Sequence, residues 1–288
     1  MTASTQPTAP WGDARTVTVG DLTFDVAVTG PHNATPVVLL HGFPESNAQW
    51  RSLAVQLADA GHRVIAPNLR GYSPGARPEG VENYTIDRLV GDVIGLLDAL
   101  DVERAHLVGH DWGGTIGWFA AIRHPERFAS YTAVSTAHPK AMLDAIAGDE
   151  SQRAAMQYIK MFREPDAAER LMAGDWRDLR ERCGDLPRDA FDEHAALLEQ
   201  PGALDAALNY YRAYGPRDAA DLGPCRIPTT YVWGEDDMAF GRTAAERTRA
   251  YVDAPYRFVE MPDTGHWISD VAPVVLATII DEQITATV

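Results

Sequence analysis

Short apolar runs that end in glycine or proline recur along this chain, and helical patterns separate them. The runs cover residues 36–42, 63–67 and 105–109 and are apolar at nearly every position. Successive side chains of a strand point to opposite faces of a sheet, so such a strand is buried on both faces. Residues 86–100 instead place their apolar side chains at helical spacing along one face. This alternation predicts an α/β fold, a mostly parallel sheet flanked by helices.

A hairpin precedes these runs. Residues 15–19 and 22–28 are two short alternating segments, and Gly20-Asp21 between them is a typical turn. The hairpin therefore predicts two antiparallel strands at the start of the sheet.

A long helical segment interrupts the sheet pattern. After a strand at 128–134 the apolar spacing is helical to about residue 226, and strands return at 228–234 and 256–261 before a final helix from about Ile268. The sequence therefore predicts a core made of residues 1–135 and 227–288, with an all-helical cap inserted at residues 136–226.

Composition excludes several classes of protein. The 288 residues include 25 Lys plus Arg against 41 Asp plus Glu, a formal charge of −16 that would repel nucleic acid. Cys183 and Cys225 are too few and too scattered for a disulfide framework or a thiolate metal site. No apolar stretch approaches the roughly 20 residues that cross a bilayer, and the N-terminus lacks a signal-peptide pattern. We therefore expect a cytoplasmic protein that binds neither nucleic acid nor membranes.

The end of the third apolar run has the form of a nucleophile elbow. Gly109-His110-Asp111-Trp112-Gly113-Gly114 follows a strand and precedes a helix expected near Thr115. In an elbow a tight turn raises one side chain above the sheet, and the flanking glycines avoid clashes with neighbouring backbone. Asp111 stands where serine is usual, which makes its carboxylate a candidate nucleophile. The alternative is a carboxylate that only caps the following helix.

A second loop can supply an oxyanion hole. His41-Gly42-Phe43-Pro44 directly follows the first buried run. In a fold with such an elbow, the backbone N–H groups of Phe43 and Trp112 would converge as two hydrogen-bond donors. An ordinary turn between strand and helix is the alternative interpretation.

Two further loops carry a histidine and a group of acids. Gly265-His266-Trp267 follows the strand at 256–261, and Glu235-Asp236-Asp237 follows the strand at 228–234. Side chains that follow parallel strands meet at one edge of the sheet, so these loops should lie near Asp111. The order nucleophile, acid, histidine is typical of a hydrolytic triad. Asp236 and Asp237 compete for the acid role, and a divalent cation bound by the three acids is a less favoured alternative.

These motifs resemble the α/β-hydrolase superfamily and, within it, the soluble epoxide hydrolase family, which also includes haloalkane dehalogenases. The resemblance covers the chain from about Arg15 onward. His41-Gly42-Phe43-Pro44-Glu45-Ser46 and Asn68-Leu69-Arg70-Gly71-Tyr72 are similar to the epoxide hydrolase pattern, although the continuation at 73–76 departs from it. The resemblance implies that Asp237 is the triad acid, through the pattern Trp-Gly-Glu-x-Asp. It implies no cofactor and no metal.

An aspartate nucleophile favours a particular chemistry. A carboxylate attacks an sp³ carbon that carries a leaving group and forms an alkyl ester with the enzyme. Water then attacks the carbonyl carbon of Asp111, with His266 as base and Asp237 orienting the imidazole. Ordinary ester or peptide hydrolysis is disfavoured, because attack by Asp111 on an ester would give an anhydride.

Two tyrosines in the predicted cap can donate a proton or a hydrogen bond during the opening of an epoxide ring. Ring opening creates an alkoxide that needs a proton or a strong hydrogen bond, and tyrosine offers one at neutral pH. The segments 157–165 and 208–212 resemble the cap motifs of epoxide hydrolases, and this resemblance makes Tyr158 and Tyr211 the ring-opening acids. Tyrosines that only pack within the cap are the alternative.

The predicted reaction is hydrolysis of a small apolar epoxide to a vicinal diol, without a cofactor. A haloalkane dehalogenase with the same triad is the first alternative; it needs a second N–H donor for the halide, which Phe43 lacks in its side chain and Trp176 could supply. A non-catalytic ligand-binding protein of the same fold is the second. We interpret Phe43, Trp112 and Trp267 as apolar walls of the substrate pocket.

Two other groups receive structural interpretations. His110 belongs to the elbow and is expected to make structural hydrogen bonds. Asp192-Glu193-His194 lacks the spacing of a metal site, and we interpret it as a solvated helix face.

Overall fold

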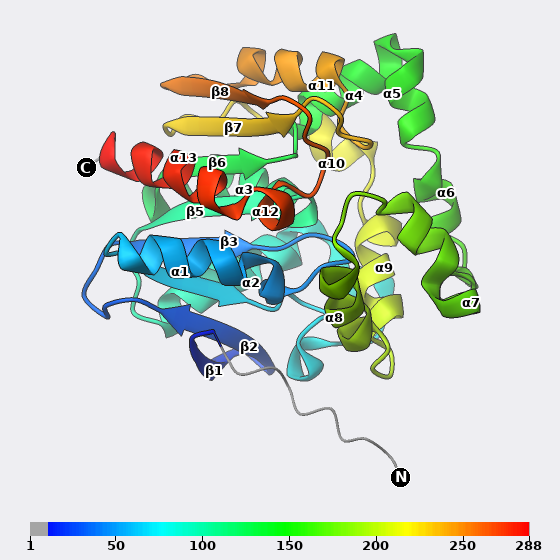
Figure 1. Cartoon of the computed structure of the whole chain (residues 1–288), viewed down its shortest axis with the longest axis horizontal. Coiled ribbons are helices and arrows are strands. Elements are labelled where there is room, and N and C mark those ends of the chain that lie inside the picture. Colours follow the sequence, from blue (N-terminus) through cyan, green and yellow to red (C-terminus); the bar gives the residue numbers. More distant parts are fainter. Residues whose placement is uncertain (1–10, 288) are drawn as a thin grey trace.

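In the computed structural model, which describes residues 11–287, eight strands form one sheet in the order β1-β2-β4-β3-β5-β6-β7-β8 (Figure 1). The first two pairings, β1–β2 and β2–β4, are antiparallel, and every pairing from β4–β3 to β7–β8 is parallel. The strands are β1 (Asp13–Val19), β2 (Leu22–Thr29), β3 (Pro36–Leu40), β4 (Arg63–Pro67), β5 (Ala105–His110), β6 (Phe128–Val134), β7 (Thr229–Gly234) and β8 (Tyr256–Met261). The prediction of an α/β fold with a mostly parallel sheet and an N-terminal hairpin is confirmed.

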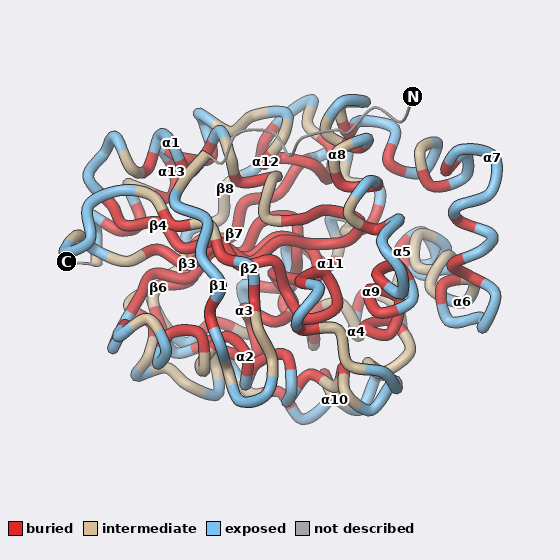
Figure 2. The backbone as a smooth tube through the Cα atoms, turned by 90° about the horizontal axis from the view of Figure 1, so that it is seen from below, coloured by how far each residue is buried: buried red, intermediate tan, exposed pale blue. Residues whose placement is uncertain are grey.

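The central strands are buried on both faces, as their continuous apolar runs require. Val37 and Leu39 of β3 belong to one hydrophobic core, whereas Val38 and Leu40 belong to the other. This split follows from the alternation of side chains along a strand. Figure 2 shows the buried strands running through the middle of the molecule, with exposed segments around them.

Helices cover both faces of the sheet. One core packs α1 (Arg51–Asp59), α12 (Ile268–Val271) and α13 (Pro273–Thr285) against the sheet. The other core holds α2 (Ile86–Ala99) and α3 (Trp112–Arg123), together with side chains of α11 (Arg242–Arg247). The sequence predicted α2 from residue 86 to 100, and the structure ends it one residue earlier.

Seven helices lie between β6 and β7, and they gather beyond the carboxyl ends of the parallel strands (Figure 1). They are α4 (Pro139–Gly148), α5 (Glu150–Ala155), α6 (Tyr158–Phe162), α7 (Ala167–Arg182), α8 (Arg188–Leu198), α9 (Ala203–Ala213) and α10 (Pro216–Ala220). Helix α7 is broken at residues 173–176, whose backbone is not helical. The division of the chain into a core and an inserted cap domain stays a prediction, and its residues 1–10 and 288 lie outside the described part.

Short 3-10 turns complete the connections, and none of the described helices could span a bilayer. The turns are η1 (Asn47–Trp50), η2 (Pro74–Ala76), η3 (Val81–Tyr84), η4 (Pro125–Arg127) and η5 (Thr248–Tyr251). Within residues 11–287, no helix combines the length and the apolar character that a membrane span needs.

Candidate active site

Asp111 stands on a sharp turn between β5 and α3. Its backbone has φ +50° and ψ −116°, a conformation that non-glycine residues rarely adopt and that is held only by well-packed surroundings. Gly109 and Gly113 make this turn possible. A Cβ on Gly109 would lie 2.3 Å from the carbonyl oxygen of Gly113, and one on Gly113 would lie 2.1 Å from that of Leu40. The turn therefore has the close approaches that the elbow motif predicts.

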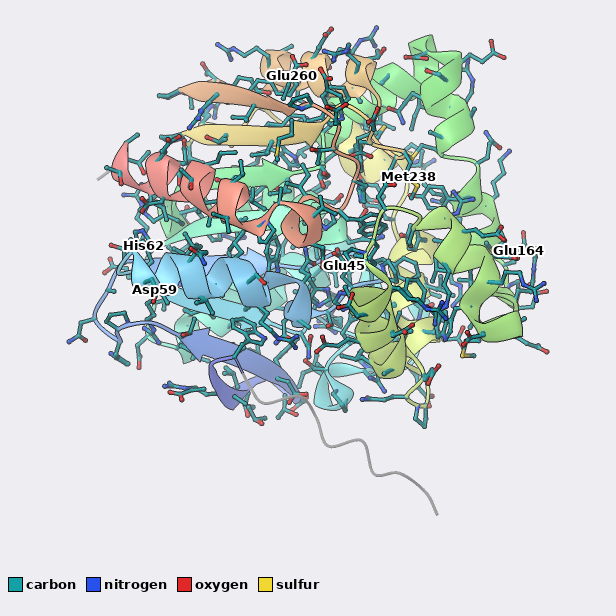
Figure 3. The ribbon with its side chains drawn as sticks, viewed as in Figure 1. Glu45, Asp59, His62, Glu164, Met238 and Glu260 are labelled. Carbon is teal, nitrogen blue, oxygen red and sulfur yellow. The ribbon has the colours of Figure 1, made fainter. Side chains whose placement is uncertain are left out.

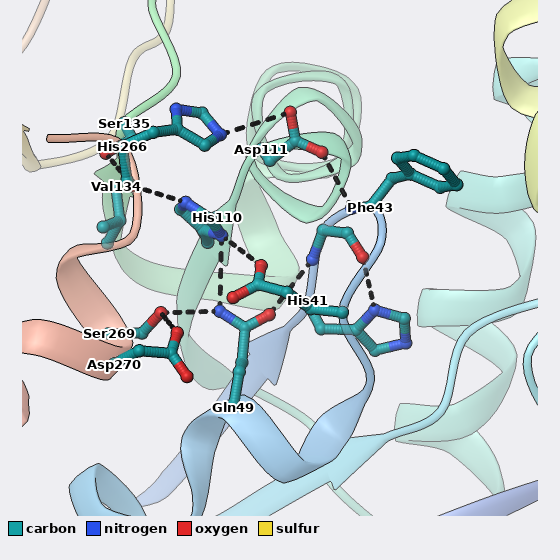
Figure 4. Close-up of polar contacts among 12 residues, drawn as sticks. His41, Phe43, Gln49, His110, Asp111, Val134, Ser135, His266, Ser269 and Asp270 are labelled. Carbon is teal, nitrogen blue, oxygen red and sulfur yellow. Dashed lines mark hydrogen bonds and ion pairs between the residues drawn. The ribbon is translucent and has the colours of Figure 1, made fainter. Parts of the chain in front are cut away.

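The carboxylate of Asp111 is held from two sides (Figure 4). The backbone N–H of Phe43 donates to Oδ1 at 2.9 Å, and Oδ2 lies 3.6 Å from Nε2 of His266. The loop that carries Phe43 is fixed by His41, whose Nε2 accepts from the N–H of Leu69 at 3.0 Å while its Nδ1 donates to Gly42. Trp112 is the first residue of α3, where backbone N–H groups have no acceptor within the helix.

His266 contacts Asp237 rather than Asp236. Its Nδ1 lies 3.0 Å from each carboxylate oxygen of Asp237. The N–H groups of Ala239 and Phe240 donate to Oδ1 of Asp237 at 2.8 and 2.9 Å and fix its orientation. Asp236 is exposed. The acids after β7 thus point in different directions, and the sequence left this choice open to geometry.

Glu235, the first acid of the loop after β7, is also engaged away from His266. Glu235 forms an ion pair with Arg242 at 3.1 Å, on the exposed side of the loop. The three acids therefore do not converge as the alternative of a shared cation requires.

The charges of Asp111, His266 and Asp237 stabilise one another. Burial alone would lower the pKa of His266, but the carboxylates of Asp237 and Asp111 outweigh burial and raise this pKa to about 10. Burial would likewise raise the pKa of Asp111, but the charge of His266 outweighs it and lowers this pKa. At neutral pH the free enzyme therefore holds an imidazolium between two carboxylates.

A buried polar network contacts His266 and the loop that carries Phe43. Nε2 of His110 donates to the carbonyl oxygen of His266 at 2.9 Å, and Nδ1 lies 2.7 Å from Oε2 of Glu45. Burial raises the pKa of Glu45 and lowers that of His110, so the proton between them stays on Glu45. The side chain of Gln49 extends the network, since it donates to Ser269 at 2.9 Å and accepts from the N–H of Gly42 at 3.1 Å. His110 therefore makes the structural hydrogen bonds expected of it.

Tyr158 and Tyr211 come together over Asp111 from two helices. Tyr158 begins α6 and Tyr211 lies in α9, and their ring centroids are 6.2 Å apart. Both line the two cavities that also contain Asp111. Burial is the main cause that raises the pKa of each phenol, so both are protonated at neutral pH. The structure thus brings together all five residues proposed for catalysis.

The predicted wall residues also border these cavities. Trp112 lines the larger cavity, whereas Phe43 and Trp267 line the smaller one beside His266. The rings of Trp112 and Tyr211 meet edge to face with centroids 5.0 Å apart. These apolar rings leave little room for solvent around the carboxylate.

The interpretation of residues 192–194 as a solvated face is wrong for His194. This side chain is buried, and its Nδ1 accepts from the backbone N–H of Ser46 at 3.1 Å. Helix α8 presents His194 to the loop after β3, a contact between segments far apart in the sequence. Asp192 and Glu193 remain on the outer side, where they pair with Arg180 and Arg51.

One group of possible metal ligands occurs among the described residues: Glu45, His194 and Asp270, whose ligand atoms lie within 4.8 Å of one another. Because Nδ1 of His194 accepts from Ser46, the neutral ring carries its proton on Nε2. A histidine that binds a metal through Nε2 usually donates its Nδ1–H to a neighbour instead. Nε2 of His194 and Oε1 of Glu45 are buried without a hydrogen-bond partner, but the proton on Nε2 leaves that atom no lone pair for a metal ion.

Trp176 does not supply the halide donor considered for a dehalogenase. It is buried, its indole N–H donates to Glu199 at 3.0 Å, and it lines neither cavity beside Asp111.

Several residues of the site were missed by sequence reasoning. Glu45 stands within the motif at 41–46, but nothing in that motif indicates its pairing with His110. Gln49 and Ser269 carry no local signal, because they lie in η1 and α12, two segments that are far apart in the sequence and meet only in the fold.

Comparisons with known proteins agree with this geometry. A family model described as the alpha/beta hydrolase fold matches residues 35–273. The chain is 33% identical to the AB hydrolase superfamily protein YfhM of Bacillus subtilis, over 93% of this chain and 96% of that protein. It is also 33% identical to epoxide hydrolase A of Mycobacterium tuberculosis, over 90% of this chain and 93% of that protein.

Solved structures of epoxide hydrolases share the architecture. An enzyme found in metagenomes from hot environments superimposes with a TM-score of 0.85 at 30% identity, over 95% of this chain and 98% of that one. Epoxide hydrolase A of Mycobacterium thermoresistibile superimposes with a TM-score of 0.82 at 26% identity, also over 95% and 98% of the two chains.

Proposed function

The chain belongs to the α/β-hydrolase family, and on that premise we propose that it is an epoxide hydrolase that forms a covalent ester on Asp111. Its relatives support an epoxide hydrolase-type function. The observation that carries the finer proposal is the position of Asp111, between an N–H donor and His266, facing two protonated tyrosines. Residues 136–226 act as the cap that brings these tyrosines over the nucleophile.

In the first step a carboxylate oxygen of Asp111 attacks an epoxide carbon. Oδ1 is engaged by the N–H of Phe43, which leaves Oδ2 as the attacking atom. The carbon–oxygen bond of the ring breaks, and the leaving oxygen takes a proton from Tyr158 or Tyr211. Their protonated state at neutral pH suits this role, because a buried phenol donates without first carrying charge.

In the second step water attacks the carbonyl carbon of the ester. The tyrosinate left by ring opening takes the proton that His266 holds in the free enzyme. The neutral ring then takes a proton from this water, and Asp237 stabilises the imidazolium that forms. The N–H of Phe43, with that of Trp112 as second donor, stabilises the oxyanion on Asp111. On collapse the leaving alkoxide takes the remaining proton of the water and departs as the vicinal diol. Asp111 returns as a carboxylate with one oxygen derived from water, and His266 returns as an imidazolium. No cofactor takes part in either step.

The dehalogenase alternative finds less support. A halide needs N–H donors on both sides, and the indole of Trp112 has no counterpart in Phe43 or in Trp176, which is engaged by Glu199. The alternative predicts bromide release from bromoalkanes with little loss in Tyr158→Phe or Tyr211→Phe. An epoxide hydrolase instead loses most of its activity when both tyrosines are replaced.

A single-turnover reaction in heavy-oxygen water tests the covalent route. With styrene oxide as substrate, we expect a diol product and incorporation of the heavy oxygen into the peptide that holds Asp111, measured by mass spectrometry. Diol without label in Asp111 would mean direct attack by water.

A variant that stops the second step provides the complement. His266→Gln removes the base but keeps Asp111, so the protein should gain the mass of one epoxide and keep it. Asp111→Ala is the matched control and should gain none. Binding of the epoxide with no turnover in the unaltered enzyme would instead favour a non-catalytic protein.

A further inference from the structure

Two cavities meet at the reacting groups. Asp111, Tyr158 and Tyr211 lie on the wall of both, so an epoxide ring held by these residues sits at the junction. We name the larger cavity the wide arm and the smaller one the narrow arm. The two arms differ in size and in what borders them.

The wide arm is large and apolar. Its volume is about 170 Å³, and its lining includes Met142, Ile146, Met156 and Ile159 from the inserted helices. An apolar cavity of about 150 Å³ accepts a benzene molecule. This arm therefore has room for one aryl or medium alkyl group.

The narrow arm has space for little more than water. Its volume is about 20 Å³, close to the roughly 10–15 Å³ that a single water needs. It borders Asp111 and His266, the two groups between which the attacking water must lie.

Buried side chains form part of the lining of the narrow arm. Phe162, Leu179 and Cys183 line it and are each at most 3% exposed. Phe162 packs against Phe43 and Tyr211 with ring centroids 5.3 and 5.0 Å away, so it cannot turn aside without moving the site. Met238, which is 39% exposed, lies between the ends of the strands and the inserted helices and also lines this arm, as does Arg182 (Figure 3).

We propose that this protein acts on terminal epoxides that carry one bulky apolar substituent, with that substituent in the wide arm and water in the narrow arm. The inference rests on the proposed epoxide hydrolase function. Trans-disubstituted epoxides place groups on opposite sides of the ring, so one group would have to enter the narrow arm. Leu179, with Phe162 and Cys183, thereby determines specificity.

The test compares kcat/KM for styrene oxide and trans-stilbene oxide, which differ by a second phenyl group on the opposite side. We expect the unaltered enzyme to favour styrene oxide at least 100-fold. Leu179→Ala enlarges the narrow arm and should reduce this preference at least tenfold. Leu171→Ala is the matched control, since Leu171 is equally buried on α7 but lines neither arm, and it should leave the preference unchanged.

A second variant tests the wide arm independently of how Leu179→Ala folds. Met142→Trp fills the wide arm and should lower kcat/KM for styrene oxide at least tenfold more than that for methyloxirane. Equal losses on both substrates would overturn the assignment of the substituent to this arm.

The outcomes separate the inference from the function on which it rests. Comparable kcat/KM for both aryl epoxides in the unaltered enzyme would overturn the inference and leave the hydrolase function standing. If styrene oxide, trans-stilbene oxide and methyloxirane all give no diol, the proposed function itself fails, and the substrate class fails with it.

Discussion

In the mechanism proposed above, His266 carries a different charge in each step, and the charge of its neighbour Asp111 decides which. In the free enzyme the carboxylates of Asp237 and Asp111 raise the pKa of His266 to about 10, so the ring is protonated at neutral pH and cannot act as a base. Esterification removes the charge of Asp111, which is one of the causes of that shift. The pKa of His266 therefore falls in the intermediate, and the ring becomes a base only after Asp111 has reacted.

This coupling predicts opposite pH behaviour for the two steps. Hydrolysis of the ester needs neutral His266, so its rate should fall about tenfold per pH unit below a midpoint that lies under 10. Ester formation needs ionised Asp111, whose pKa is lowered, so its rate should stay flat through neutral pH. Stopped-flow measurement of the rates of both steps from about pH 5 to about pH 10 checks this prediction. A hydrolysis rate that is flat over that range would contradict the role of His266 as base.

Helices α6 and α9 carry the two tyrosines, and hydrogen bonds from two arginines tie these helices together. Arg163, just after α6, donates to the carbonyl oxygens of Tyr211 and Tyr214 at 2.8 Å each. Arg212 of α9 donates in return to the carbonyl of Glu164 at 3.1 Å. The last carbonyls of a helix have no partners within it, so Arg163 both completes the end of α9 and fixes its distance from α6.

Loss of this tie should affect ring opening before it affects folding. We expect Arg163→Ala to slow ester formation about tenfold, which corresponds to about 1.4 kcal/mol of barrier, with a smaller effect on ester hydrolysis. Arg163→Lys should restore only part of the rate, because a single ammonium cannot match the planar fork of arginine. Arg217→Ala, at an exposed arginine of neighbouring α10, is the control. Equal slowing of both steps would indicate a general loss of structure.

The elbow is the element that the sequence specified most completely. Its glycines, its strand and its following helix are local features, and the clash distances at Gly109 and Gly113 show why no larger residue fits there. The tie through Arg163 has no such local signal, because its partners come from a helix more than forty residues away.

The charge of the whole molecule bears on which epoxides can approach. A formal charge of −16 creates a negative field that repels anions and does not act on neutral molecules. Raising NaCl from about 0.01 M to about 1 M shortens the Debye length from about 30 to about 3 Å. Over this range kcat/KM for an epoxide that bears a carboxylate should rise a few-fold, whereas that for styrene oxide should stay constant. A similar salt response for both substrates would show that the field plays no part.

The sequence by itself determined the features that depend on neighbouring residues along the chain. Runs such as 63–67 gave strands with the predicted bounds, because a strand buried on both faces must be apolar throughout. The position of Asp111 followed from the glycines around it, and the edge of the sheet where the loops meet followed from the parallel strands.

Only the tertiary structure decided the features that depend on direction and packing. Asp237 contacts His266 while Asp236 faces solvent, a difference set by two backbone N–H groups that hold one carboxylate. His194 is buried because α8 packs against the loop after β3, which its neighbours in sequence do not reveal. The unequal arms depend on how α6 and α7 pack over the strand ends, and no local pattern encodes the volume left between them.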